Sequence, residues 1–193
     1  MKSILCFCLF SILLMACKKD SGSSDADYYF VGQLDGADLK FEITDSSSDE
    51  MIISNSSSLN PPICTYSYGC DIGTGPGTAT EKSISVSFQQ IFQGDCGDQL
   101  TVFPSLFPKG DYVVGEDSGN VLITYFDGTD NWTSYGVLQT GANFEITESE
   151  VVESPFGSSQ KIHGKCSCIL YNISGESKKL EDVSFVLSFW PEI

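Results

Sequence analysis

Short runs in which apolar and polar residues alternate recur along this chain, and they constrain its fold more than any other feature. At residues 39–44 and 83–88 every second side chain is apolar, which places the apolar side chains on one face of an extended strand. Asp35-Gly36 lies between the runs at 28–34 and 39–44 and predicts a hairpin, and turn-forming pairs such as Asp127-Gly128 separate other runs. Because no window of helical length has apolar residues three and four apart, the pattern predicts an all-β fold.

The turns divide the chain into about ten strands. They are expected at residues 28–34, 39–44, 51–54, 63–69, 83–92, 112–115, 121–127, 131–138, 143–153, 161–171 and 182–190. Residues 55–62, 71–82 and 93–108 are rich in Gly, Pro, Ser and Thr, and are expected to be loops. Many short strands joined by frequent turns favour an antiparallel β-sandwich, and a lipocalin-like barrel is the alternative.

The first residues have a different pattern. One positive charge, Lys2, precedes an apolar run at residues 4–15, which is the layout of a secretory signal peptide. A helix of that length would span about 18 Å, too short for a hydrocarbon core of about 30 Å. The segment Leu14-Met15-Ala16-Cys17 resembles the bacterial lipobox. This resemblance implies cleavage after Ala16 and a diacylglycerol on the Cys17 thiol. A cleaved signal peptide without lipid is the alternative.

The chain is therefore expected to have three parts: a lipoprotein signal peptide (residues 1–16), a lipidated Cys17 with a flexible tether (17–27) and one domain (28–193). The tether is predicted because residues 18–27 contain a single apolar side chain. Lys18-Lys19-Asp20 also resembles the charged export tag of surface lipoproteins in the Bacteroidetes. That resemblance implies the outer membrane as the location, whereas a plain solvated tether would leave the membrane face open.

The charge balance argues against one class of partner. The chain has 26 Asp and Glu, ten Lys and no Arg, so its formal net charge is −16, and it becomes −17 when Lys2 leaves with the signal peptide. Proteins bind nucleic acids by neutralising phosphates with Lys and Arg. We therefore expect no nucleic-acid partner. Because anionic headgroups also repel such a protein, the expected membrane contact is the lipid on Cys17.

Five cysteines follow Cys17, at positions 64, 70, 96, 166 and 168. An exported protein meets oxidising conditions, which permit disulfides. Cys64 and Cys70 would be about 20 Å apart along an extended strand, too far for a disulfide. Cys166 and Cys168 would share the core-facing side of their strand with Ile162, Gly164 and Leu170, so they would point in parallel and are not expected to pair. A hairpin of residues 63–69 and 83–92 would bring Cys64 near Cys96, and this pairing is predicted.

No catalytic residue, resident cofactor or structural zinc is expected. His163 is the only imidazole, it is expected on the solvated face of its strand, and no Gly-x-Ser-x-Gly motif accompanies it. Cys166-Ser167-Cys168 lacks the spacing and the four ligands of zinc sites. Acidic turns could hold calcium, with Asp127, Asp130 and Asn131 as the candidate ligands, although turn carboxylates are usually solvated. Two acids could also form a glycosidase pair, which sequence alone does not locate.

Aromatic residues near a turn provide the candidate ligand-binding surface. Trp132 and Tyr135, with Tyr66 and Tyr68, could form a platform for a sugar, and core packing is the favoured alternative for each. Trp132 follows a turn directly and is expected to be the most exposed of them.

Several segments resemble a group of small Bacteroidetes lipoprotein domains of unknown function. They are the opening strand that ends in Asp35-Gly36, then residues 107–115 (FPKGDYVVG), 121–125 (VLITY) and 162–168 (IHGKCSC), and a Phe-rich last strand. The resemblance implies a β-sandwich in the cell envelope and provides no catalytic residues. We expect a non-enzymatic module that binds a protein or glycan partner, or has a structural role, with a small glycan-active hydrolase or a lipocalin-like carrier as alternatives.

Overall fold

The computed structural model describes residues 26–45, 47–60, 63–74, 81–93, 103–115, 121–135, 139, 141–155 and 157–191. These residues form eleven β-strands and one short 3-10 helix, η1 (Phe103–Leu106). The strands are β1 (Tyr28–Leu34), β2 (Ala37–Ile43), β3 (Asp49–Asn60), β4 (Ile63–Thr74), β5 (Ser83–Gln93), β6 (Gly110–Tyr112), β7 (Val121–Phe126), β8 (Asn131–Thr133), β9 (Asn143–Ser154), β10 (Gly157–Tyr171) and β11 (Ser177–Phe189).

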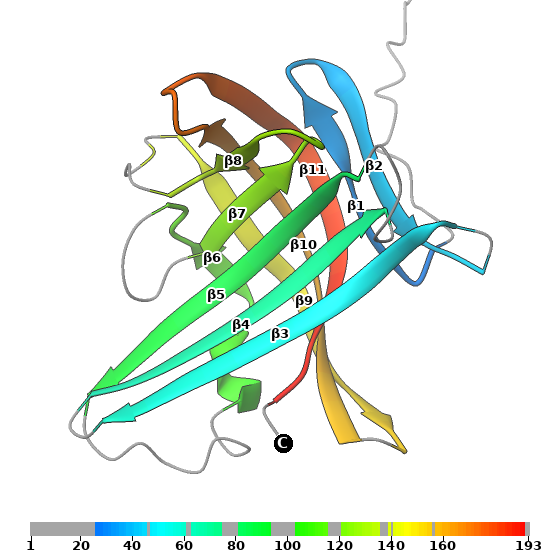
Figure 1. Cartoon of the computed structure of the whole chain (residues 1–193). Coiled ribbons are helices and arrows are strands. Elements are labelled where there is room, and N and C mark those ends of the chain that lie inside the picture. Colours follow the sequence, from blue (N-terminus) through cyan, green and yellow to red (C-terminus); the bar gives the residue numbers. More distant parts are fainter. Residues whose placement is uncertain are drawn as a thin grey trace, which may run out of the picture.

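The strands form one open antiparallel sheet that folds over on itself. The main path runs β2-β1-β11-β10-β8-β7-β5-β4-β3, while β9 pairs with β10 and β6 pairs with β9. Only one residue pair, Tyr171 with Thr133, joins β10 to β8. This join separates a layer of β3, β4, β5, β7 and β8 from a layer of the other six strands (Figure 1). The all-β, sandwich-like prediction is confirmed, and the described strands do not close into a lipocalin-like barrel.

Aromatic rings fill the space between the two layers. Phe88 of β5 is almost completely buried and lies at the centre of this core. Four rings meet it edge-on, with centroids 5.1–5.5 Å away: Phe107, Tyr112, Phe144 and Phe189. Edge-to-face contacts of this kind add about 0.5–1.5 kcal/mol each to the benefit of burial. The centre of the sandwich, around Phe88, is therefore a close-packed aromatic core.

Two local predictions are confirmed. Leu34 pairs directly with Ala37 across Asp35-Gly36, and both turn residues have positive φ, 51° and 76°, as a tight two-residue hairpin requires. On β10 the predicted inward face is buried throughout: Ile162, Gly164, Cys166, Cys168 and Leu170.

The expected loops at residues 55–62 and 71–82 are partly wrong. β3 and β4 are each twelve residues long and pair along their whole length, so residues 55–60 and 71–74 belong to strands. Their Ser, Asn and Gly residues show no apolar alternation, and the strand conformation follows from main-chain pairing with the neighbouring strand. The expected strand at 131–138 is shorter in the structure, because β8 ends at Thr133.

Candidate functional site

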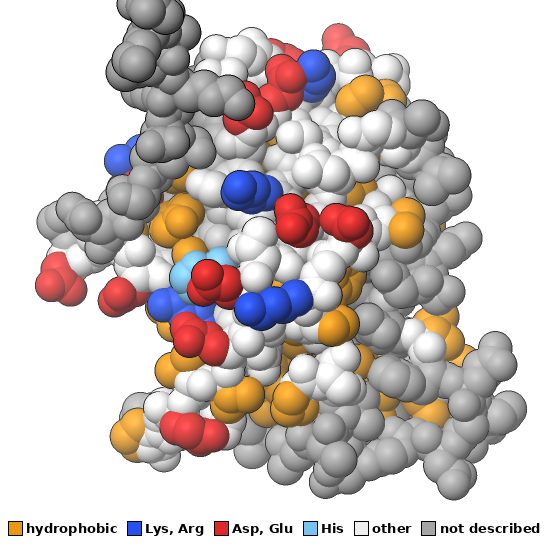
Figure 2. Space-filling view, turned by 180° about the vertical axis from the view of Figure 1, so that it is seen from behind, with side chains coloured by type: hydrophobic (Ala, Val, Ile, Leu, Met, Phe, Trp, Pro, Cys, Tyr) orange, Lys and Arg blue, Asp and Glu red, His pale blue; other side chains and the backbone are white. Residues whose placement is uncertain are grey.

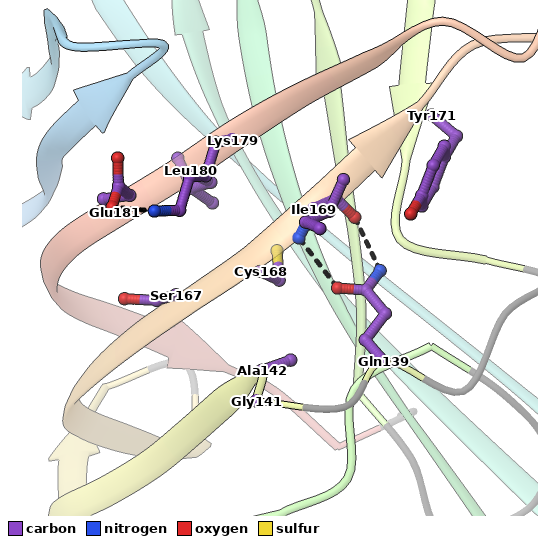
Figure 3. A pocket seen from close by; sticks show the side chains of 10 residues that line it. All are labelled: Gln139, Gly141, Ala142, Ser167, Cys168, Ile169, Tyr171, Lys179, Leu180 and Glu181. Atoms are coloured by element: carbon purple, nitrogen blue, oxygen red, sulfur yellow. Dashed lines mark hydrogen bonds and ion pairs between the residues drawn. The ribbon is translucent and has the colours of Figure 1, made fainter.

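A cavity of about 410 Å³ lies at the join of the two layers (Figure 3). Here the pairing of β10 with β9 ends at Ser167, which lies opposite Asn143. Further along β10, Tyr171 pairs with Thr133 of β8. The cavity size falls within the usual range of about 300–1,000 Å³ for small-molecule sites. The lining residues are Gln139, Gly141, Ala142, Ser167, Cys168, Ile169, Tyr171, Lys179, Leu180 and Glu181.

Gln139 fills the gap between β9 and β8 along the edge of β10. Its Oε1 accepts a hydrogen bond from the backbone N–H of Ile169 (2.7 Å), and its Nε2 donates to the carbonyl of the same residue (2.5 Å). Directly opposite residues of an antiparallel sheet exchange the same two bonds. The side-chain amide of Gln139 therefore takes the place of one strand residue and fixes one wall of the cavity (Figure 3). The sequence analysis missed this residue.

The cavity lining includes two oppositely charged side chains and one thiol. Lys179 forms an ion pair with Glu181. Burial raises the pKa of the Cys168 thiol to about 12, and thiols react as thiolates. The Cys168 thiol is therefore not an activated nucleophile.

Exposed apolar side chains, together with the half-buried Tyr171, lie beside the cavity. Ile169 and Tyr171 are on the same face of β10, and Ile173, two residues past the end of that strand, is fully exposed. Tyr135 is 63% exposed and follows two residues after Thr133, the partner of Tyr171. We call these four residues the seam patch. Exposed apolar groups next to a cavity are a common feature of binding surfaces.

The expectation that Trp132 is the most exposed of the four aromatic candidates is wrong, whereas the favoured alternative, core packing, agrees with its burial. Its side chain is only 6% exposed, because the Lys178 ammonium lies 4.0 Å from its ring centroid and its Nε1 donates to Asp127 Oδ2 (2.7 Å). Tyr66 and Tyr68 are buried in the core. Of the four aromatic candidates, only Tyr135 remains available to a ligand.

Other groups occupy the carboxylate of Asp127, the first of the calcium candidates. Its Oδ1 accepts from the backbone N–H groups of Asp130 (2.9 Å) and Thr129 (3.0 Å), and its Oδ2 accepts from Trp132 Nε1 and Lys178 Nζ (2.9 Å). The hydrogen bond from Asp130 and then those from Lys178 and Trp132 hold the pKa of Asp127 well below its usual range. Asp130 and Asn131 are exposed beside it. No group of three or more His, Cys, Asp or Glu in the described part of the chain could hold a metal ion.

His163 lies on the outer face of the six-stranded layer. It is paired with Val186 of β11 and Glu148 of β9. Figure 2 shows Lys and acidic side chains intermingled around it. Opposite charges also face each other across β9 and β10, in the pairs Lys161–Glu150 and Lys165–Glu145. Cross-strand pairs of this kind stabilise a sheet, and this charged face matches the solvated setting expected for His163.

Cys64 is disulfide-bonded. Its predicted partner, Cys96, lies outside the described residues, so the Cys64–Cys96 pairing stays a prediction. Cys70, Cys166 and Cys168 are free and buried, which agrees with the expectation that neither close pair would form a disulfide. Burial raises the pKa of each of these three thiols.

The lipobox residues Leu14, Ala16 and Cys17 also lie outside the described residues. Within the described ranges, no helix is long and apolar enough to cross a bilayer. No family model, curated protein or solved structure matches the chain.

Proposed function

We propose that this protein is a lipid-anchored lipoprotein of the cell envelope, and that its β-sandwich is a non-enzymatic module that binds a protein or glycan partner. The observation that carries the binding proposal is the cavity at the join of the layers, with the seam patch beside it. The lipobox at Leu14, Ala16 and Cys17 supports the anchor.

The cavity offers a fixed surface of mixed chemistry. The bonds between Gln139 and Ile169 hold one wall in place, so a ligand would meet a preformed site and lose little free energy in ordering it. Ser167 offers a hydroxyl group, while Ile169 and Tyr171 offer apolar surface. Aromatic and aliphatic groups supply contact area, and a few fixed polar groups orient the ligand.

The proposed anchor places the module close to a membrane. Cleavage after Ala16 would leave Cys17 as the first residue, and a diacylglycerol with a further acyl chain holds a protein firmly. The ten residues after Cys17 would separate the lipid from the domain by about 17–19 Å if they behave as a flexible chain. The partial export tag at Lys18-Lys19-Asp20 supports the outer membrane as the location.

A photoreactive side chain at the seam patch tests the binding proposal. A benzoylphenylalanine is introduced at Tyr135 in the full-length protein, and intact cells are irradiated. The matched control position is Val151, which is 51% exposed. Val151 pairs with Gln160, so it lies about 30 Å along β10 from Ile169 at roughly 3.3 Å per residue. We expect a discrete adduct from position 135 that the probe at position 151 does not form.

The nature of the adduct identifies the class of partner. A protein partner gives an adduct in which mass spectrometry finds peptides of a second protein, whereas a glycan partner gives an adduct that glycosidase shortens. The proposal is overturned if position 135 forms no adduct, or if positions 135 and 151 form the same adducts with equal yield.

A further inference from the structure

The two end strands of the sheet differ in how their free edges are protected. β2 is only seven residues long and carries Asp38, Lys40 and Glu42. The backbone N–H of Glu42 donates to Asp49 Oδ2 (2.9 Å), so a side chain already occupies part of this edge. Short length, charges and side-chain caps are the usual means by which proteins prevent edge strands from pairing with other chains.

β3 has none of these protections along its middle. It pairs with β4 and with no other strand of the described structure. Its residues Ile52–Ser56 contain no charge, proline or glycine. Ile52, Ser54 and Ser56 are exposed, Ile52 to 57%. Figure 1 shows β3 as the outer strand of its layer. An uncharged edge of this length can accept a further strand.

We propose that β3 pairs antiparallel with β3 of a second copy of this chain, so that the two sheets become one. The charge pattern along the strand supports both the orientation and the partner. The acidic residues Asp49 and Glu50 lie at one end of β3, and the other end, Leu59-Asn60, is uncharged. Antiparallel pairing centred on Ile52–Ser56 keeps the acidic residues of the two copies at opposite ends of the interface, and Asp49 remains bonded to the Glu42 backbone N–H of β2. Parallel pairing would set the acidic residues side by side, which is unfavourable.

The side chains at this edge also permit a two-fold arrangement. Ile52, Ser54 and Ser56 lie on the outer face of β3, because alternate residues share a face. An axis through Ser54 would set Ile52 of one copy opposite Ser56 of the other and would keep the outer faces continuous. Ser54 pairs with Gly69, and its Oγ occupies the space that a side chain at position 69 would fill, because a Cβ there would lie only 2.5 Å from Ser54 Oγ. Such an interface is self-complementary, as a two-fold dimer requires.

Cysteine cross-linking in the native membrane tests this proposal. Ile52→Cys, Ser54→Cys and Ser56→Cys are introduced one at a time in the full-length protein, and mild oxidant is added. The control is Ser85→Cys on β5, on the same outer face but between β4 and β7. The native free thiols Cys70, Cys166 and Cys168 are buried. We expect at least one edge variant to give tenfold more homodimer, at twice the mass of the chain, than Ser85→Cys.

A second set of variants separates pairing from chance collision. Ile52→Lys together with Ser56→Lys places charges on the edge, and should reduce the Ser54→Cys homodimer at least tenfold. Ser67→Lys adds a charge to the same face one strand inward, opposite Ser56 on β4, and should leave the yield within twofold. Cross-linking no greater than in Ser85→Cys, an adduct with a different protein, or equal loss with Ser67→Lys would each overturn the proposal.

Discussion

Replacing Asp127 by asparagine should lower the free energy of unfolding by about 2–3 kcal/mol. The carboxylate accepts four hydrogen bonds, and its Oδ2 accepts those from Trp132 Nε1 and Lys178 Nζ. An asparagine oxygen could still accept from Thr129 and Asp130, but its Nδ2 would then face two donors. The Trp132 N–H would lose its partner in a buried setting, which costs about 1–3 kcal/mol. Lys178 is 23% exposed and can return to water, so the loss of the ion pair adds less.

The effect should also depend on pH with a defined sign. The pKa of Asp127 lies well below its usual range in the folded protein, whereas it is about 3.9 in an unfolded chain. The stabilisation by this carboxylate is therefore complete above about pH 5. It declines as pH falls below about 4, because the Asp127 carboxylate then binds a proton in the unfolded chain but stays ionised in the folded protein. The difference between wild type and Asp127→Asn should shrink there by up to about 1.4 kcal/mol per pH unit.

Urea unfolding at pH 7, 4 and 3, followed by tryptophan fluorescence, measures both effects. Asp130→Asn is the matched control, because it removes the same charge from an exposed position of the same loop. This variant should change the free energy of unfolding by less than about 0.5 kcal/mol. Equal values for the two variants at pH 7, or a difference from wild type that grows toward pH 3, would refute the reasoning.

Three other predictions concern packing and cysteine chemistry. Gly164→Ala should lower the free energy of unfolding by about 3 kcal/mol in urea titrations, because the added methyl would overlap the ring of Phe185 and a backbone oxygen of β9; an unchanged midpoint would contradict this. Cys168, whose pKa is about 12, should react with iodoacetamide at pH 8 about a thousandfold more slowly in the native protein than in urea, and equal rates would show that it is not buried. Peptide mapping of the non-reduced protein should find Cys64 linked to Cys96, and a different partner for Cys64 would disprove that pairing.

Local rules predicted the parts of the fold in which neighbouring residues decide the outcome. Alternation placed Cys166 and Cys168 on the inward face of β10, and the pair Asp35-Gly36 predicted a hairpin. The length of β3 and β4 was not predictable in this way. Their Ser-rich halves have no apolar pattern, and the pairing along all twelve residues of each strand makes them extended.

The candidate site depended on contacts between distant parts of the sequence. Trp132 was expected to be the most exposed of the aromatic candidates because it follows a turn, yet Lys178 of β11 covers its ring. Gln139 binds the backbone of Ile169, thirty residues further along the chain. A single glutamine that follows Val137-Leu138 gives no sequence signal for such a contact. Only Tyr135 was predicted as a ligand-binding residue and also lies beside the cavity.

Incorporation of labelled fatty acid tests the lipid anchor, on which the proposed function depends, most directly. Cells that express the full-length protein are grown with labelled palmitate, and Cys17→Ser is compared with wild type. Cys6→Ser is the control, because Cys6 lies within the proposed signal peptide and would leave with it. Wild type and Cys6→Ser should be labelled and processed, whereas Cys17→Ser should carry no label and accumulate as the longer precursor. Normal labelling and processing of Cys17→Ser would contradict the lipid anchor.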